Sequence, residues 1–306
     1  RLIDSLLENK IEPILTLFHY DLPQALQDAG GWPNRETAYA FGDYAHVLAE
    51  HFSDRVTWWI THNEPFVTAT MGHLTGEHAP GMHDIGCTLA SAHHLLLSHG
   101  LAVQAIRAST SRPLQVGIAL NLSPAYPATE SEADQQAAAR YDGFLNRMML
   151  DPLFRQEYPK DVTDMLGWFL PKIESGDMQT IAEPMDFLGV NYYTRAVIKH
   201  HPDVPFIEFE EIHPTGSSYS QMWEIFPPGI SELVTRVWKD YQPAKIFLTE
   251  NGICVPDGTD YDGKIRDNRR IQYLQDHLVA LHSVLEAGVP LMGYLVWTLM
   301  DNFEWE

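Results

Sequence analysis

The sequence predicts an α/β fold, a parallel (β/α)8 TIM barrel of which about six β/α units are present. Six apolar stretches of strand length alternate with segments of helical periodicity, as in sheets built from parallel strands. No linker, internal repeat or low-complexity tract interrupts the 306 residues, so we expect a single domain over residues 1–306. Because a complete barrel of this type needs eight strands, the predicted barrel is incomplete.

The predicted elements follow one another along the whole chain. The opening residues have the apolar spacing of a helix end, and Asn34 is the candidate N-cap of a helix that runs to about His51. Residues 197–213 form an excursion with alternating β character. The strands are predicted at residues 13–18, 56–60, 114–120, 186–190, 245–248 and 291–297. The further helices are predicted at residues 85–108, 130–149, 230–241 and 268–287.

Two of these strands end in a glutamate beside an asparagine. The strand at 56–60 runs into Asn63 and Glu64, and the fifth strand runs into Glu250 and Asn251. Catalytic groups of a parallel barrel sit at the carboxyl ends of its strands, so we expect both glutamates in a pocket, with asparagine side chains that can bind a sugar hydroxyl. Paired carboxyl groups cleave glycosidic bonds, with retention when they are about 5–5.5 Å apart and inversion at about 6.5–9.5 Å, and the sequence leaves this distance open.

Charge and composition narrow the class of partner. The 41 acidic and 20 basic residues give a formal charge of −21, which repels nucleic acid and anionic membrane surfaces. A neutral small-molecule partner fits better, and the 8 Trp, 13 Tyr and 13 Phe include possible platforms for sugar rings, although core packing explains most of them. The longest apolar run, residues 291–300, is too short to cross a bilayer.

Other chemistries find little support in the sequence. Cys87 and Cys254 cannot form a disulfide framework or a cysteine-rich zinc site, which favours a cytoplasmic location. The common nucleotide loops GxGxxG and GxxxxGK[ST] do not occur. His93, His94 and His99 lie on one predicted helix, but they lack the spacing and the glutamate of a zinc helix. We therefore expect no metal, and we expect His94 and His99 to pack or cap beneath the barrel.

Several motifs resemble those of one family. Residues 61–65 (THNEP) and 249–252 (TENG) resemble the two signatures of glycoside hydrolase family 1, the β-glucosidase and β-galactosidase family of retaining (β/α)8 barrels. Four further segments occur in the order typical of that family, so the resemblance covers nearly the whole chain. They are residues 16–23 (TLFHYDLP), 30–35 (GGWPNR), 191–194 (NYYT) and 297–305 (WTLMDNFEW).

The resemblance implies a role for each matching residue. It makes Glu64 the acid/base and Glu250 the nucleophile, and it implies a hydrogen bond from Tyr193 to Glu250. Asn63 would bind the sugar hydroxyl beside the reacting carbon, Asn191 would line the site, and no cofactor is needed. The remaining family positions that hold the sugar match His19, Trp297, Glu304 and Trp305.

The implied activity is that of a retaining exo-β-glycosidase, above all a β-glucosidase, acting on β-glucosides and short β-linked oligosaccharides. A 6-phospho-β-glycosidase is an alternative, disfavoured because Glu304 would repel the phosphate. A thioglucosidase is disfavoured because Glu64 is present. A truncated, non-catalytic sugar-binding protein is the alternative from another class.

The sequence also departs from the family pattern. Phe66 stands where many members carry Trp, and His62 replaces a common apolar residue. The family's first two strands and last helix have no counterpart, so we expect a chain truncated at both ends. The strands at 13–18 and 291–297 would then be sheet edges, which a second copy of the chain could cover as a homo-oligomer.

Overall fold

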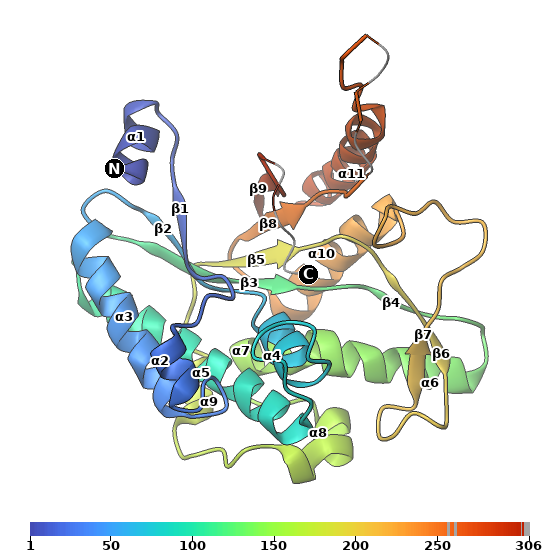
Figure 1. The fold of residues 1–306 in the computed structure, drawn as a ribbon, viewed down its shortest axis with the longest axis horizontal. Helices are drawn as coiled ribbons and strands as arrows, with labels where there is room; N and C mark the ends of the chain where they lie inside the picture. The colour runs from blue at the N-terminus through green and yellow to red at the C-terminus, as the bar shows by residue number, and fades with distance from the viewer. Residues whose placement is uncertain (256–257, 260–261, 301, 303–306) are drawn as a thin grey trace. The chain divides into compact units, whose positions relative to one another are not determined.

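The computed structural model describes residues 1–255, 258–259, 262–300 and 302 (Figure 1). Two compact units are distinguished in it. Unit 1 contains residues 1–121 and 147–189, and unit 2 contains residues 122–146 and 190–302. No helix among the described residues has both the length and the apolar character that crossing a membrane requires.

The main sheet has six strands in the order β1-β2-β3-β5-β8-β9. The pairs β1–β2, β2–β3 and β8–β9 are parallel, and the predicted incomplete (β/α)8 barrel is confirmed. As predicted, β1 and β9 are the end strands of this order. Every predicted strand is present, and its bounds differ from the prediction by at most three residues. The strands are β1 (Ile14–Phe18), β2 (Trp58–Asn63), β3 (Gln115–Asn121), β5 (Phe187–Asn191), β8 (Ile246–Asn251) and β9 (Leu291–Val296).

Unit 1 is built around a long buried helix, α5 (Ile85–Ala108), which packs against α3, α4 and α9. A side chain at Gly100 of α5 would meet the carbonyl oxygen of Thr180 at 1.7 Å, so α5 and α9 touch through their backbones. The other helices of this unit are α1 (Leu2–Glu8), α2 (Gln24–Asp28), α3 (Glu36–Phe52), α4 (Pro65–His73), α7 (Met148–Arg155), α8 (Lys160–Leu166), the short 3-10 helix η2 (Gly167–Phe169) and α9 (Asp177–Ile181).

Two predicted helices differ in detail. The helix predicted from Asn34 begins later, with Arg35 as its N-cap, and the Asn34 Oδ1 accepts a hydrogen bond from the Glu36 amide at 3.2 Å instead. The helix predicted at 130–149 is α6 (Glu132–Asp142) followed by a π-helical turn, η1 (Gly143–Arg147), and then by α7. Glycine at the start of this turn lowers the preference for a regular helix, which explains why one long helix was wrong.

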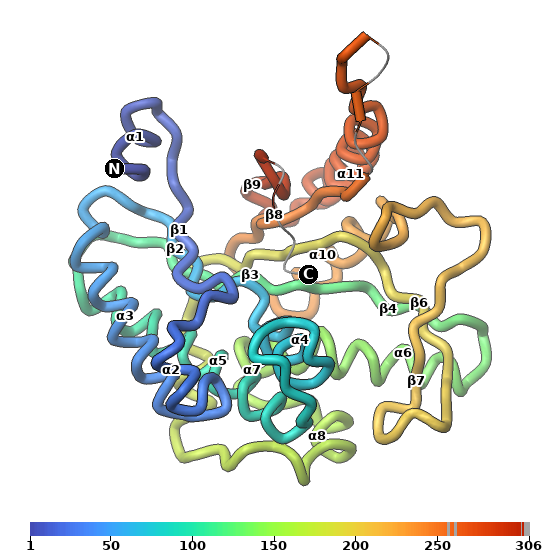
Figure 2. Tube along the Cα trace, viewed as in Figure 1, coloured from blue at the N-terminus to red at the C-terminus, as the bar shows by residue number. Residues whose placement is uncertain are grey.

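Unit 2 contains α6, α10 (Pro227–Tyr241), α11 (Asn268–Glu286) and a second, three-stranded sheet. Strand β6 (Ala196–His200) pairs in parallel with β4 (Ala125–Pro127) and antiparallel with β7 (Phe209–Glu211). Figure 2 shows these three strands beside α6. Small side chains of α6, including Ala137 and Ala138, pack on Ala196 and Ile198. The predicted excursion at 197–213 therefore corresponds to part of this sheet.

Candidate active site

Glu64 lies at the carboxyl end of β2, where the chain turns into α4. Its backbone is left-handed, with φ 47° and ψ 61°, and Pro65 begins the helix directly after it. The Glu64 amide donates to the carbonyl oxygen of Ala119 in β3 at 2.9 Å. A left-handed non-glycine residue costs about 1–2 kcal/mol, and such residues cluster where function needs a fixed geometry. The half-buried Glu64 is thus held in a costly but defined position.

A β-bulge precedes Glu64. Between Ile60 and Asn63, β2 advances three residues while β3 advances two, from Gly117 to Ala119. An extra residue in one strand changes the direction of the side chains that follow it, and bulges are frequent beside active sites.

The bulge brings two adjacent side chains of β2 to the same helix. The Thr61 hydroxyl is 2.7 Å from Nδ1 of His99, and Nε2 of His62 is 2.7 Å from the Ser98 hydroxyl. His99 and Ser98 both belong to α5. Burial, and then the charge of His99, lowers the pKa of His62, so the ring stays neutral in the core. The strand under Glu64 is therefore anchored to α5 by buried hydrogen bonds.

The end of β1 lies beside Asn63 and Glu64. Nε2 of His19 is 3.3 Å from Nδ2 of Asn63, so two predicted sugar-binding residues are neighbours. The Tyr20 hydroxyl donates a hydrogen bond to Oε2 of Glu64. Tyr20 was not among the predicted site residues, although its position directly after His19 at a strand end was a signal.

Glu250 lies in β8 and is 7% exposed. The Tyr193 hydroxyl donates to its Oε2 at 2.6 Å, which is the hydrogen bond that the family resemblance implies. The Glu250 carbonyl oxygen accepts from the Tyr192 amide at 3.0 Å. Backbone and side chain are both fixed, so the carboxyl group of Glu250 is preorganised.

The Asn251 side chain makes hydrogen bonds to other residues of the protein core. It is fully buried, and its Nδ2 donates to the Tyr192 carbonyl at 2.7 Å and to the Tyr273 hydroxyl at 2.8 Å. Its Oδ1 accepts from the Tyr294 hydroxyl at 2.6 Å. The interpretation of both asparagines as sugar-binding is therefore wrong for Asn251, because its amide group is satisfied within the core.

Two further predicted residues make hydrogen bonds to the residues on either side of Glu250. The buried Asn191, at the end of β5, accepts a hydrogen bond from the Thr249 hydroxyl at 2.6 Å. The half-buried Trp297 follows β9, and its amide donates to the Asn251 carbonyl at 3.0 Å. A side chain at Gly252 would meet the Trp297 carbonyl oxygen at 2.0 Å, so this turn requires glycine.

The predicted residues divide between the two units. His19, Asn63 and Glu64 belong to unit 1, whereas Asn191, Tyr193, Glu250 and Trp297 belong to unit 2. Glu304 and Trp305 lie outside the described residues. Among the residues that the structure describes, no group of three or more His, Cys, Asp or Glu side chains is arranged to hold a metal ion.

An incomplete parallel α/β barrel in which strands end at the half-buried Glu64 and the buried Glu250 has the architecture of a barrel enzyme. The family model "Glycosyl hydrolase family 1" matches residues 1–306, and the chain belongs to this family of glycosyl hydrolases.

Individual relatives agree with this assignment. The "Beta-glucosidase A" of Thermotoga maritima is 42% identical over 310 residues, which cover 100% of this chain and 68% of that protein. The "1,4-beta-D-glucan glucohydrolase" of Thermotoga neapolitana is 41% identical over 307 residues, covering 100% of this chain and 72% of the relative. A solved structure, "Family 1 b-glucosidase from Thermotoga maritima", superimposes with a TM-score of 0.96 at 41% identity and covers 100% of this chain and 68% of that one.

Proposed function

We propose that the chain is a retaining exo-β-glycosidase, and that its main activity is that of a β-glucosidase. The observation that carries the proposal is the buried Glu250, fixed by Tyr193 at the end of β8, in a member of glycosyl hydrolase family 1. The activities for which these relatives are named support the proposed substrate class, β-glucosides and short 1,4-β-glucans.

In the proposed first step, Glu250 attacks the anomeric carbon as Glu64 protonates the departing glycosidic oxygen. The bond to the aglycone breaks, and an ester forms between the sugar and Glu250. In the second step, Glu64 takes a proton from water, whose oxygen attacks the anomeric carbon and displaces Glu250. Both steps invert the anomeric carbon, so the β configuration is retained, and the reaction as written needs no cofactor.

The other predicted residues would bind the sugar that is released. His19 and Asn63 offer polar groups from unit 1, and Asn191 offers one from unit 2, where the sugar ring would stack on Trp297. We propose the same role for Glu304 and Trp305, and we propose that the two units act together as one catalytic domain.

A 6-phospho-β-glycosidase is a second candidate because one relative carries that name. The "6-phospho-beta-glucosidase GmuD" of Bacillus subtilis is 37% identical over 319 residues, covering 99% of this chain and 68% of the relative. The carboxylate of Glu304 would repel a phosphate group, which favours the neutral substrate. Parallel assays with an aryl β-glucoside and its 6-phosphate decide between the two.

Two variants test the proposed roles. Glu250→Ala should lower turnover of an aryl β-glucoside by several orders of magnitude, and added azide should partly restore turnover and give the α-glycosyl azide. Glu64→Ala should impair substrates with poor leaving groups far more than those with acidic phenols, and azide should then give the β-glycosyl azide. Glu130→Ala, which removes an exposed carboxylate, is the control.

The azide products decide whether the two roles are assigned correctly. A β product from Glu250→Ala would show that Glu250 is not the nucleophile. Equal losses for good and poor leaving groups in Glu64→Ala would contradict the acid role of Glu64. Sugar binding without any turnover in the unsubstituted chain would support the alternative of a non-catalytic binding protein.

The proposed partner is a small carbohydrate, and a second copy of the chain is a further proposed partner. Its support is the position of β1 and β9 at the ends of the strand order, together with exposed apolar side chains on β9 such as Met292 and Val296.

A further inference from the structure

Tyr20 and Glu64 are linked by a side-chain hydrogen bond across 44 positions of sequence, with Tyr20 as the donor. Both residues are left-handed, with φ 73° for Tyr20 and φ 47° for Glu64. Two other left-handed residues of the chain, Gln156 and Gln242, are C-caps of helices, where this conformation is common. Tyr20 and Glu64 follow strands instead. Both residues joined by this hydrogen bond are therefore held in a backbone conformation that costs conformational free energy.

The surroundings of Tyr20 keep its ring in place. Its ring centroid is 5.1 Å from that of His19 and 5.7 Å from that of His78, which comes from the loop after α4. His62 of β2 and His73 of α4, two titratable side chains of unit 1, have hydrogen-bond partners of their own. His62 bonds to Ser98, and His73 of α4 bonds to a backbone carbonyl.

We infer that Tyr20 is a positioning residue for Glu64, whose hydroxyl holds Oε2 and favours the ionised carboxyl group. The inference rests on the proposed acid/base role of Glu64. A donor to a carboxylate stabilises the charged form, so Tyr20 raises the ionised fraction of Glu64, which is the form that must act as a base in the second step.

Unit 2 contains the matched case. Tyr193 donates to Oε2 of Glu250 at 2.6 Å, so each proposed catalytic glutamate receives one tyrosine hydroxyl within its own unit. Tyr193 therefore supplies a control. Removing its hydroxyl should affect the acid limb of the pH profile, whereas removing the Tyr20 hydroxyl should affect the alkaline limb.

The test compares Tyr20→Phe with Tyr193→Phe in the full chain, using kcat/KM for a β-glucoside with a poor leaving group. Such profiles report the ionisation of the free enzyme. A hydrogen bond to a charged group contributes about 1.5–3 kcal/mol, and one pH unit corresponds to about 1.4 kcal/mol. Tyr20→Phe should move the alkaline limb upward by about one pH unit and leave the acid limb in place. Tyr193→Phe should move the acid limb upward.

A structural role alone would lower activity without moving the limb. In the Glu64→Ala background, Tyr20→Phe should cause no further loss with a dinitrophenyl glucoside. An unmoved alkaline limb in Tyr20→Phe, or an equal fold loss with and without Glu64, would overturn the inference while the proposed β-glucosidase activity stands. If the Phe variant does not fold, Tyr20→Met also lacks a side-chain hydrogen-bond donor and should show the same shift.

A second measurement does not depend on turnover. In chain labelled with carboxyl-13C glutamate, the Glu64 signal is assigned by its loss in Glu64→Gln, and its titration midpoint is followed by NMR. Tyr20→Phe should raise this midpoint by about one pH unit. An unchanged midpoint would overturn the inference even in an inactive chain, whereas an inactive chain with a raised midpoint would contradict only the proposed function.

Discussion

Buried histidines are a notable feature of this protein at the scale of single residues. His99 is fully buried in α5, and burial, followed by the nearby charge of Arg107, lowers its pKa from 6.5 to about 3. Its Nδ1 is bonded to Thr61 in the strand that leads to Glu64. Burial is also the first cause of the lowered pKa of other core histidines, namely His62, His73, His93, His94 and His277.

The lowered pKa of His99 predicts an acid-sensitive fold. Between pH 6.5 and about 3, the unfolded chain binds a proton at this position that the folded chain does not. The contribution of a neutral, buried His99 to the free energy of unfolding is therefore fully present above pH 6.5. It is lost as the pH falls, with a slope of about 1.4 kcal/mol per pH unit for each such histidine. Urea unfolding at about pH 7.5 and about pH 5 should give a smaller pH difference for His99→Gln than for the unsubstituted chain.

The exposed His282, on α11, provides the control. His282→Gln should keep the full pH dependence of the unsubstituted chain. An equal pH dependence in His99→Gln and the unsubstituted chain would show that His99 contributes none of it.

Single residues also show the limit of prediction from sequence. Glu64 and Glu250 were identifiable because each follows an apolar strand within a specific motif. Asn251 also follows an apolar strand beside Glu250, yet its side-chain hydrogen bonds go to Tyr192, Tyr273 and Tyr294. The partnership of Tyr20 with Glu64 depends on where two loops meet in space, which local sequence does not encode.

At the scale of elements, parallel strands were predictable because burial on both faces gives continuous apolar runs. The helix α4 was missed because its sequence, PFVTATMGH, follows Glu64 without an amphipathic pattern and six of its nine residues are buried. The small sheet of β4, β6 and β7 was only partly foreseen, since β4 has three residues and pairs with a strand about 70 positions away.

The contact between α5 and α9 gives a prediction for elements. Gly100→Ala should destabilise the protein by about 1–3 kcal/mol or more, because the new Cβ meets the Thr180 carbonyl at 1.7 Å and one helix must move. Thermal unfolding followed by circular dichroism measures the change. Gly167→Ala, where a Cβ meets nothing within 4 Å, should leave the midpoint nearly unchanged. Equal midpoints for the two variants would contradict the close approach.

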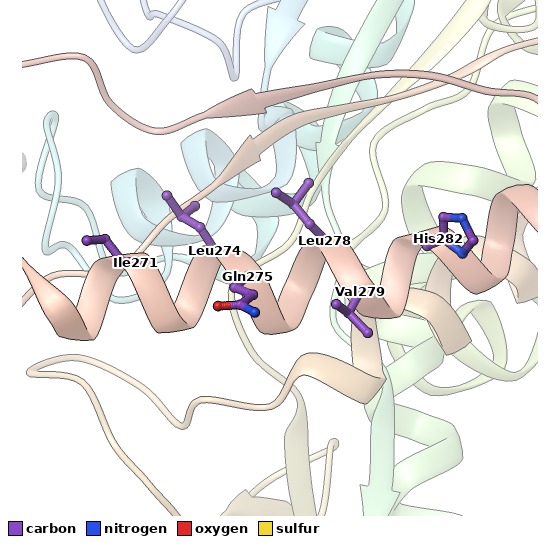
Figure 3. Close-up of a pocket in the computed structure, with 6 residues that line it drawn as sticks. All are labelled: Ile271, Leu274, Gln275, Leu278, Val279 and His282. Carbon is purple, nitrogen blue, oxygen red and sulfur yellow. The ribbon is translucent and has the colours of Figure 1, made fainter.

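At the scale of the whole molecule, an apolar helix face and a large net charge have opposite effects on self-association. Figure 3 shows side chains that line a shallow pocket along α11. Leu278 is 47% exposed and Val279 67% exposed, whereas the chain carries a net charge of −21. Apolar surface favours association with a second copy, and charge repulsion resists it. The lining residues, called the α11 face, are Ile271, Leu274, Gln275, Leu278, Val279 and His282.

Salt should therefore promote self-association. Between about 0.01 M and about 1 M NaCl the Debye length falls from about 30 Å to about 3 Å, which screens the repulsion. Light scattering should show a higher mean mass at high salt, and Leu278→Lys with Val279→Lys should weaken association at least about tenfold, or about 1.4 kcal/mol. Gln272→Lys with Ser283→Lys adds the same charge at exposed polar positions of α11 and should have a smaller effect. A mass that is independent of salt would contradict association through the α11 face.

The bulges in β2 and β8 have a consequence for insertions and deletions. Side chains along a strand alternate between the two faces of the sheet. One extra residue between Ile60 and Asn63 therefore reverses which residues face each side, just before Glu64. Between Leu248 and Asn251, β8 likewise advances three residues while β9 advances two. Glu250 therefore also lies within a β-bulge. Deleting one residue from either bulge would restore ordinary pairing and turn the carboxylate to the opposite face. Each glutamate therefore depends on the length of its strand as much as on its own identity.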